Sequence, residues 1–301
     1  MYLRNKLGLV FVFIFLSAYA KAQQDFQKSF KDLSARNDTI AQTKLLKEWE
    51  AAKPKDPELY IAYFNFYVNK SQESGISLGS KPGNEESLKL SDTGTGKHVG
   101  YLNFSTNYKT EFLQKGFDYI DKGIAFHPTR LDMRFGKIYM LGEAKNYEMF
   151  TEVIIETIDH SNSIKDAWLW KEGKPLEDAK EFFLSSIQDY IGTLYNTEND
   201  DLLPNMRRIS EAILKYNPAH VISLANVALT YIIKEDYDKG LTYLLRAEKI
   251  DPNDIIVLNN IAEVYTRKKD KPNAKIYYEK IIKMGNKEEA DDARDKLKKL
   301  N

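Results

Sequence analysis

The sequence predicts an all-α fold, an α-solenoid of about six helix-turn-helix pairs with a C-terminal capping helix and a small inserted β-hairpin. Two stretches of chain align without gaps at a spacing of about 34 residues, so that Asn217-Pro218 corresponds to Asp251-Pro252. Apolar residues within these stretches recur three and four residues apart, which is the pattern of a helix with one buried face. A repeat of this length is typical of helical hairpins that bury their apolar faces by stacking.

Composition and charge restrict the classes of function. The 301 residues include 44 Lys and Arg, 44 Asp and Glu, and no cysteine. Nucleic acid is an unsuitable main partner, because phosphate binding requires a basic excess. The lack of cysteine excludes disulfides, thiolate metal sites, a cysteine nucleophile and a cysteine-linked lipid anchor. Because disulfides are common in exported eukaryotic proteins, it also favours a bacterial envelope protein.

Residues 1–22 are predicted to be a secretory signal peptide. Arg4 and Lys6 precede an apolar run over residues 7–20, and small residues follow up to Ala22, which is the order of regions in such a signal. The run is shorter than the roughly 20 residues that a membrane span needs, although an uncleaved anchor is the alternative. We expect cleavage after Ala22, no membrane span in the mature chain, and a periplasmic or secreted protein.

Helical hairpins are predicted for residues 23–70, followed by an insertion over residues 71–107. Asp38 is a suitable N-cap for a helix that ends at Ala52. The insertion contains six of the fifteen glycines. Within it, apolar and polar residues alternate over residues 87–91 and 99–104, which predicts a small β-hairpin folded back on the helices. Disorder of the insertion is the alternative.

One part of the insertion has a superficial likeness to a phosphate-binding loop. It runs from Ser91 through Gly94, Gly96 and Lys97 to His98. That motif needs glycine where Ser91 stands and Ser or Thr where His98 stands, and it needs a strand followed by a helix. We therefore expect no nucleotide and no other cofactor.

Degenerate helical pairs are predicted for residues 108–186, where the regular spacing is interrupted. Trp168 and Trp170 lie in this region, two residues apart. They are candidates for an aromatic ligand platform that would bind a sugar or a peptide. Packing into the core is the favoured alternative, since large aromatic side chains dominate protein cores.

Residues 187–286 contain the clearest repeats. Tyr231 corresponds to Tyr265 at the repeat spacing, and Ala228 corresponds to Ala262. This period, with small, aromatic and proline positions at fixed offsets, resembles the tetratricopeptide repeat (TPR). The sequence departs from that motif at three positions, with leucine where tryptophan is common and isoleucine where alanine is usual: Leu224, Leu258 and Ile281. Residues 287–301 are highly charged, as a solvent-facing capping helix must be.

The resemblance implies a concave surface, lined by the first helix of each pair, that binds an extended peptide or a helix of a partner. The inward-facing offsets of the family map onto eight residues of this sequence: Ile222, Asn226, Leu229, Ile233, Ile256, Asn260, Glu263 and Arg267. Asparagines at two of these offsets often hydrogen-bond a ligand backbone in the family. The alternative is that Asn226 and Asn260 link neighbouring helices.

The leading functional hypothesis is a non-enzymatic scaffold or adaptor of the bacterial cell envelope that binds another protein. The alternative is a carbohydrate- or nutrient-capturing helical-repeat protein of the outer-membrane system. An enzyme is the weakest hypothesis, because no acid, base and nucleophile converge in the sequence. No metal site is expected either, because no two of the four histidines have the spacing of metal ligands: His98, His127, His160 and His220.

Overall fold

The computed structural model describes residues 25–83 and 86–300, and the chain divides into two compact units, Met1–Pro128 and Thr129–Asn301. The predicted signal peptide, residues 1–22, lies outside the described residues. Among the described residues no helix combines the length and the apolar composition that crossing a membrane requires.

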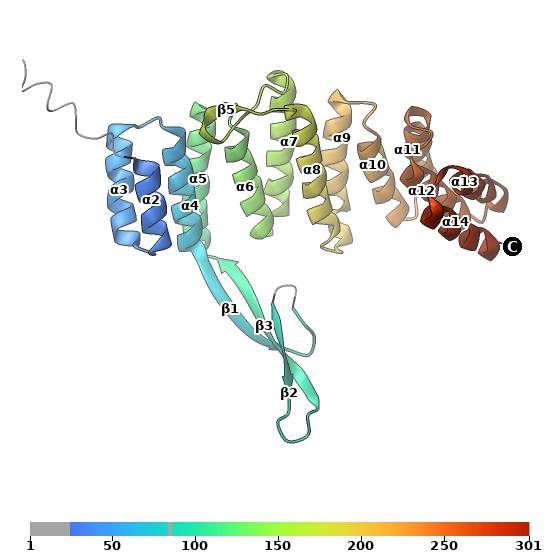
Figure 1. Ribbon diagram of the computed structural model, residues 1–301, viewed down its shortest axis with the longest axis horizontal. Helices are drawn as coiled ribbons and strands as arrows, with labels where there is room; N and C mark the ends of the chain where they lie inside the picture. The colour runs from blue at the N-terminus through green and yellow to red at the C-terminus, as the bar shows by residue number, and fades with distance from the viewer. Residues whose placement is uncertain (1–24, 84–85, 301) are drawn as a thin grey trace, which may run out of the picture. The chain divides into compact units, whose positions relative to one another are not determined.

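The first unit consists of two helical pairs and a sheet that interrupts the second pair (Figure 1). Its helices are α2 (Phe26–Ala35), α3 (Thr39–Ala52), α4 (Pro57–Ser71) and α5 (Thr110–Phe126), and its strands are β1 (Gln72–Gly79), β2 (Ser87–Ser91) and β3 (His98–Tyr108). The N-cap predicted for α3 is confirmed, since the Asp38 side chain accepts a hydrogen bond from the backbone N–H of Ala41.

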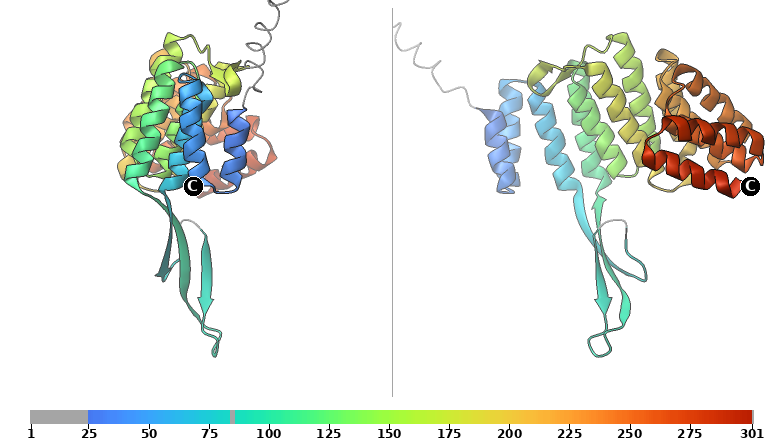
Figure 2. Two further views of the ribbon diagram at one scale, coloured as in Figure 1. Left: turned by 90° about the vertical axis from the view of Figure 1, so that its left-hand side faces the viewer. Right: turned by 45° about the vertical axis from the view of Figure 1, so that its right-hand side comes forward.

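The second unit contains four helical pairs and a final helix, which follow one another in chain order (Figure 2). The helices are α6 (Leu131–Glu143), α7 (Tyr147–Ser163), α8 (Ala179–Tyr195), α9 (Leu203–Tyr216), α10 (Val221–Ile233), α11 (Tyr237–Ile250), α12 (Ile255–Arg267), α13 (Lys271–Met284) and α14 (Lys287–Leu300). Two short strands, β4 (Leu169–Trp170) and β5 (Lys174–Pro175), pair between α7 and α8. The described residues thus confirm the prediction of six pairs and a capping helix.

The turn between the two helices of a pair is built in the same way in four pairs. Its left-handed residue is Asn37, Lys145, Glu235 or Lys269, with φ between 53° and 62°. The next residue caps the second helix through its side chain, and it is Asp38, Asn146, Asp236 or Asp270. Because the turn recurs in α2–α3 and α6–α7, the degenerate pairs share the local geometry of the clear repeats.

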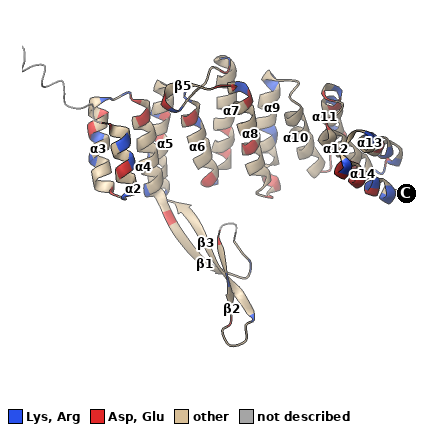
Figure 3. Cartoon of the chain, in the orientation of Figure 1, with Lys and Arg blue, Asp and Glu red and all other residues tan. Residues whose placement is uncertain are grey.

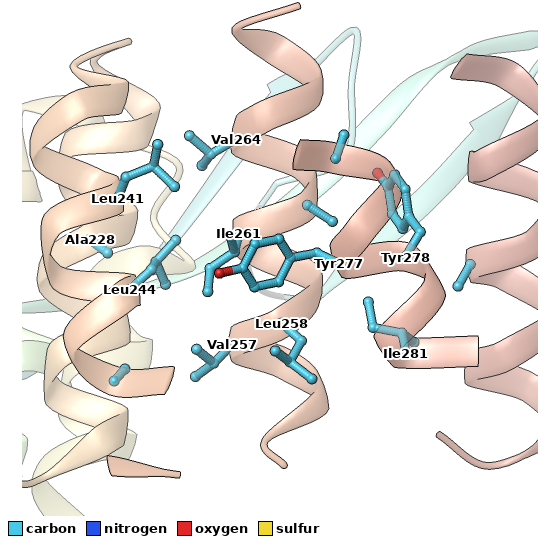
Figure 4. Packing of buried hydrophobic residues seen from close by; sticks show 14 of the residues in the cluster. Ala228, Leu241, Leu244, Val257, Leu258, Ile261, Val264, Tyr277, Tyr278 and Ile281 are labelled. Atoms are coloured by element: carbon cyan, nitrogen blue, oxygen red, sulfur yellow. The ribbon is translucent and has the colours of Figure 1, made fainter. Parts of the chain in front are cut away.

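The packing of the last two pairs recurs at equivalent positions of the repeat. Tyr231 stacks on Tyr243 with ring centroids 5.9 Å apart, and Tyr265 stacks on Tyr277 at 5.8 Å. Helix α12 contacts both α11 and α13. Figure 4 shows its buried side chains between those of the two neighbours, with Leu241 and Leu244 on α11, Val257, Leu258 and Ile261 on α12, and Tyr277, Tyr278 and Ile281 on α13. Each such apolar side chain, when fully buried, stabilises the fold by about 1.5–3 kcal/mol relative to exposure.

One close approach between helices accounts for a glycine in this packing. A Cβ added at Gly240 would lie 2.7 Å from Cγ1 of Ile232, so α11 can pack this closely on α10 only without a side chain there. At the equivalent positions of the next repeat, Thr266 replaces Ile232 and Ala274 replaces Gly240. The smaller residue on one helix is therefore matched by a larger one on the other.

The predicted β-hairpin is confirmed, but its surroundings differ from the prediction. β2 and β3 pair antiparallel, and β1 adds a third strand on the other side of β3, which the sequence did not predict. The hairpin does not fold back on the helices. Instead, the sheet extends from the ends of α4 and α5 away from them (Figures 1 and 2). The alternation of apolar and polar residues predicts a sheet with two different faces. It does not determine whether a helix covers either face, so the prediction that the hairpin packs on the helices was wrong.

Candidate functional site

A groove in the second unit lies between the first helices of two successive pairs, α8 and α10. Its volume is about 740 Å³. The lining includes the apolar side chains of Leu184 and Ile222, and Ile222 is 53% exposed. It also includes charged side chains of both signs on α8 and at its N-terminus: Asp178, Lys180, Glu181 and Asp189. The groove therefore combines apolar with charged side chains, which is the composition of a peptide or small-ligand site.

A hydrogen bond joins α10 to α8 along this groove. Nδ2 of Asn226 donates to Oε1 of Gln188 at 2.7 Å. Nε2 of Gln188 is buried and has no hydrogen-bond partner among the described residues. Asn226 thus links two helices, which is the alternative that the sequence left open for it.

His220 caps the N-terminus of α10 at the end of the groove. Its Nδ1 accepts a hydrogen bond from the backbone N–H of Ser223 at 3.3 Å and lies 2.8 Å from the Ser223 Oγ. Burial, together with the positive charge of Lys180, lowers the pKa of His220. Both effects favour the neutral ring, which is the form whose nitrogen can accept the capping hydrogen bond.

The other predicted binding residues lie along α10 and α12. Leu229, Ile233 and Asn260 are half-buried, and Ile256 and Arg267 are exposed. Glu263 forms an ion pair of 3.1 Å with Lys296 of α14, a partner that the sequence did not predict. Of the eight predicted residues, only Ile222 is in the lining of the groove.

The two tryptophans are packed differently. Trp168 is 1% exposed, and its indole N–H donates to Oγ of Ser161 at 2.7 Å. Trp170 is half-buried, and its ring meets those of Phe135 and Phe182 edge-on. Trp168 is therefore a core residue, and Trp170 contributes to an aromatic cluster.

The loop that resembles a phosphate-binding loop is the turn between β2 and β3. Oδ1 of Asp92 accepts hydrogen bonds from the backbone N–H groups of Gly94 and Thr95 and from the Thr95 hydroxyl. The hydrogen bonds of Thr95 are the main cause that lowers the pKa of the Asp92 carboxyl. A carboxylate of the chain thus already takes the donors that a phosphate would need. Within residues 25–83 and 86–300, no group of three or more His, Asp or Glu side chains is placed to hold a metal ion.

Sequence reasoning missed the α8 side of the groove. Gln188 lies 38 residues before Asn226, which exceeds the repeat period by about one helical turn. The repeat spacing therefore maps Asn226 onto the wrong position of α8. Lys180, Leu184 and Gln188 are each four residues apart, so the helical period could have found them once the start of α8 was known.

Comparison with known proteins identifies the repeats. The tetratricopeptide-repeat family matches residues 222–254 and 256–288, which cover α10–α11 and α12–α13 except for the first residues of α10 and α12. None of the curated proteins matches the chain.

Several solved structures align with much of the chain. YrrB, described as a TPR protein with an unusual peptide-binding site, is 14% identical, with 81% of this chain and 95% of that chain covered and a TM-score of 0.34. The structure of pilF of Pseudomonas aeruginosa is 9% identical, with 90% of this chain and 96% of that chain covered and a TM-score of 0.36. The structure of yeast Tom70 is 10% identical, with 87% of this chain and 59% of that chain covered and a TM-score of 0.33. With identities and TM-scores this low, the assignment depends on the two matched repeats and on the helical pairs that form them. Residues 222–288 therefore form two tetratricopeptide repeats.

Proposed function

We propose that this protein is a non-enzymatic scaffold that binds a peptide or helix of another protein on the first helices of its second unit. The observation that supports this most strongly is the groove between α8 and α10, whose lining combines the exposed side chain of Ile222 with charged side chains. An apolar side chain of a partner would bury Ile222 and Leu184, and the charged side chains of the lining would orient the partner's polar groups.

The exposed isoleucines support a binding surface that continues onto α12. Ile222 and Ile256 are equivalent residues of successive repeats, at the second position of α10 and α12, and both are exposed. A large apolar side chain in water at equivalent positions of adjacent repeats is what an interaction surface requires. The second candidate, carbohydrate capture, loses one of the two rings on which it depends, because Trp168 is in the core.

We also propose that the protein acts in the bacterial cell envelope. This part depends on the sequence of residues 1–22, with a basic start, an apolar run and a small-residue cleavage site. Mass spectrometry of the protein isolated from the cells that make it is expected to find Gln23 as the first residue. A chain that retains Met1 would contradict export with cleavage.

Binding is tested by capture of partners from the native cell envelope, with the tagged wild-type chain and two variants. Ile222→Lys places a charge in the groove, and we expect it to reduce the captured partner at least tenfold. Ile276→Lys is the matched control, since Ile276 is 50% exposed on α13, a second helix of its pair. The control should capture as the wild type does. Equal capture by all three chains, or an equal loss in both variants, would exclude the groove as the binding site.

A further inference from the structure

The sheet of the first unit has one apolar and one polar face. In an antiparallel pair, residues opposite each other project to the same side. The register pairs Ile76 with Phe104, and both Leu78 and Leu88 with Leu102. Together with the next outward residue of β2, these form what we call the apolar face: Ile76, Leu78, Leu88, Leu90, Leu102 and Phe104. Leu78 is 75% exposed and Ile76 is 65% exposed.

The charges of the strands lie on the opposite face. Glu73 and Lys89 are the only Asp, Glu, Lys or Arg residues in the three strands. Their register partners are Asn107 and Tyr101, which alternate with the apolar residues of β3. Figure 3 shows the strands almost entirely in the colour of uncharged residues. The apolar face is thus uncharged along its whole length.

Within the described part of the chain, the polar face of the sheet is covered and the apolar face is not. Asn103, on the polar face, accepts hydrogen bonds at Oδ1 from the Gly83 backbone N–H and the Ser87 hydroxyl, and its Nδ2 donates to the Lys81 carbonyl. Lys81 and Gly83, which follow β1, are therefore held against the polar side of the sheet. The apolar side remains open to water, although its leucine and isoleucine side chains would gain from burial.

We propose that a second copy of this chain covers the apolar face, with the two sheets packed face to face about a two-fold axis. The face suits itself as a partner, because two uncharged apolar surfaces meet without charge repulsion and without leaving a charge unpaired. Two sheets of the same strand twist pack about 10 Å apart with their inner side chains interdigitated. The sheet extends beyond α4 and α5, so these helices leave the face accessible.

The area of the face determines the strength of the dimer. Three strands about 4.8 Å apart and about eight residues long at about 3.3 Å per residue give a face of about 380 Å². Two copies would then bury about 760 Å² in total, which is less than the 1,200–2,000 Å² or so of a stable specific interface. The dimer is therefore in exchange with the monomer and forms as the protein concentration rises.

Sedimentation of the full chain over a concentration series tests the dimer. We expect a monomer–dimer equilibrium whose dissociation constant rises at least tenfold in Leu78→Lys. Ser77→Lys, an exposed position on the polar face, is the matched control and should dimerise as the wild type does. A wild-type chain that stays monomeric at all concentrations would overturn the proposal, and so would equal dissociation constants of the two variants. Flotation with phosphatidylcholine vesicles, run in parallel, shows whether a monomeric chain binds lipid through this face instead.

Cysteine cross-linking tests the geometry and does not depend on the lysine variants. Because the chain has no cysteine, Ile76→Cys and Leu88→Cys each introduce one thiol on the apolar face, and Ser77→Cys and Lys89→Cys each introduce one on the polar face. With a bifunctional maleimide of about 10 Å, matched to the sheet spacing, we expect cross-linked dimers only from the apolar positions. Equal cross-linking from both faces would indicate pairing of β1 edges between copies and would overturn face-to-face packing.

Discussion

Asn226 and Gln188 join the first helices of two successive pairs through a hydrogen bond of 2.7 Å. The two side chains belong to α10 and α8, beside the groove that we propose as the binding site. The equivalent residue of the next repeat, Asn260, has no side-chain hydrogen bond among the described residues. Two asparagines at the same offset therefore differ, because one forms a hydrogen bond between helices and the other does not.

This difference predicts unequal stability losses. Asn226→Ala should lower the free energy of unfolding by about 0.5–1.5 kcal/mol, because it removes the donor to Gln188. Asn260→Ala should change it by less than about 0.5 kcal/mol. Urea unfolding followed by circular dichroism measures both, and Gln188→Ala completes a double-mutant cycle with Asn226→Ala. Equal losses in the two asparagine variants would contradict the assigned roles.

Overpacking is predicted at Ala247, which is buried between α11 and its neighbours. Ala247→Leu should lower the free energy of unfolding by about 1–3 kcal/mol, since the added methyl groups have no space in a packed core. Thr242→Leu, at an exposed position of the same helix, is the control and should change it by less than about 0.5 kcal/mol. Thermal unfolding of both variants decides this, and an unchanged melting temperature for Ala247→Leu would mean that the helices are packed differently.

Glycine is predicted to stabilise the turn between α10 and α11. Glu235 has φ of 62°, a conformation that costs about 1–2 kcal/mol for residues with a Cβ. Glu235→Gly removes this strain but also increases the conformational entropy of the unfolded chain, which opposes folding. The net effect should be a rise of about 0.5–1 kcal/mol in the free energy of unfolding. Lys234→Gly, one residue earlier at φ −85°, should lower it instead. Chemical denaturation compares the two, and changes of the same sign would exclude strain at Glu235.

The cap formed by His220 predicts a pH dependence. Its pKa is lowered in the folded chain by burial and by Lys180, so the unfolded chain binds a proton more readily than the folded chain does. The stabilisation is complete above the ordinary histidine pKa of about 6.5 and is lost as the pH falls through the lowered pKa.

His220→Asn tests this, because asparagine caps a helix without titrating near neutrality. The difference in free energy of unfolding between wild type and variant should shift in favour of the variant between pH 7.5 and pH 5. Urea unfolding at several pH values measures this difference. A constant difference across this range would show that His220 does not contribute to the pH dependence.

Much of the fold could be predicted because its determinants are close in sequence. The helix starts, the left-handed turns and the contact of Tyr231 with its own pair depend on residues within about a dozen positions. By contrast, β1 contains two glycines, Gly75 and Gly79, and only two apolar residues in alternation, Ile76 and Leu78. Its own sequence therefore gives little indication of a strand. It forms because β3 offers it a partner in register.

The candidate site was predictable on one side only. The offsets of the repeat identified three exposed residues of α10 and α12, namely Ile222, Ile256 and Arg267, because a helix turns its residues by a constant angle wherever it lies. They could not identify Gln188, whose distance along the chain departs from the period, nor the salt bridge that occupies Glu263. Nor could the spacing of Trp168 and Trp170 decide which ring would be buried.

By itself, the amino-acid order determined that the chain folds into paired helices and where most of those helices begin and end, since caps, turns and helical periodicity act between near neighbours. Only the tertiary structure decided that α8 and α10 line a groove, that Asn226 bonds to Gln188, and that apolar side chains of three strands share one face of the sheet. Those features depend on which surfaces meet, and packing between segments far apart in the chain selects them.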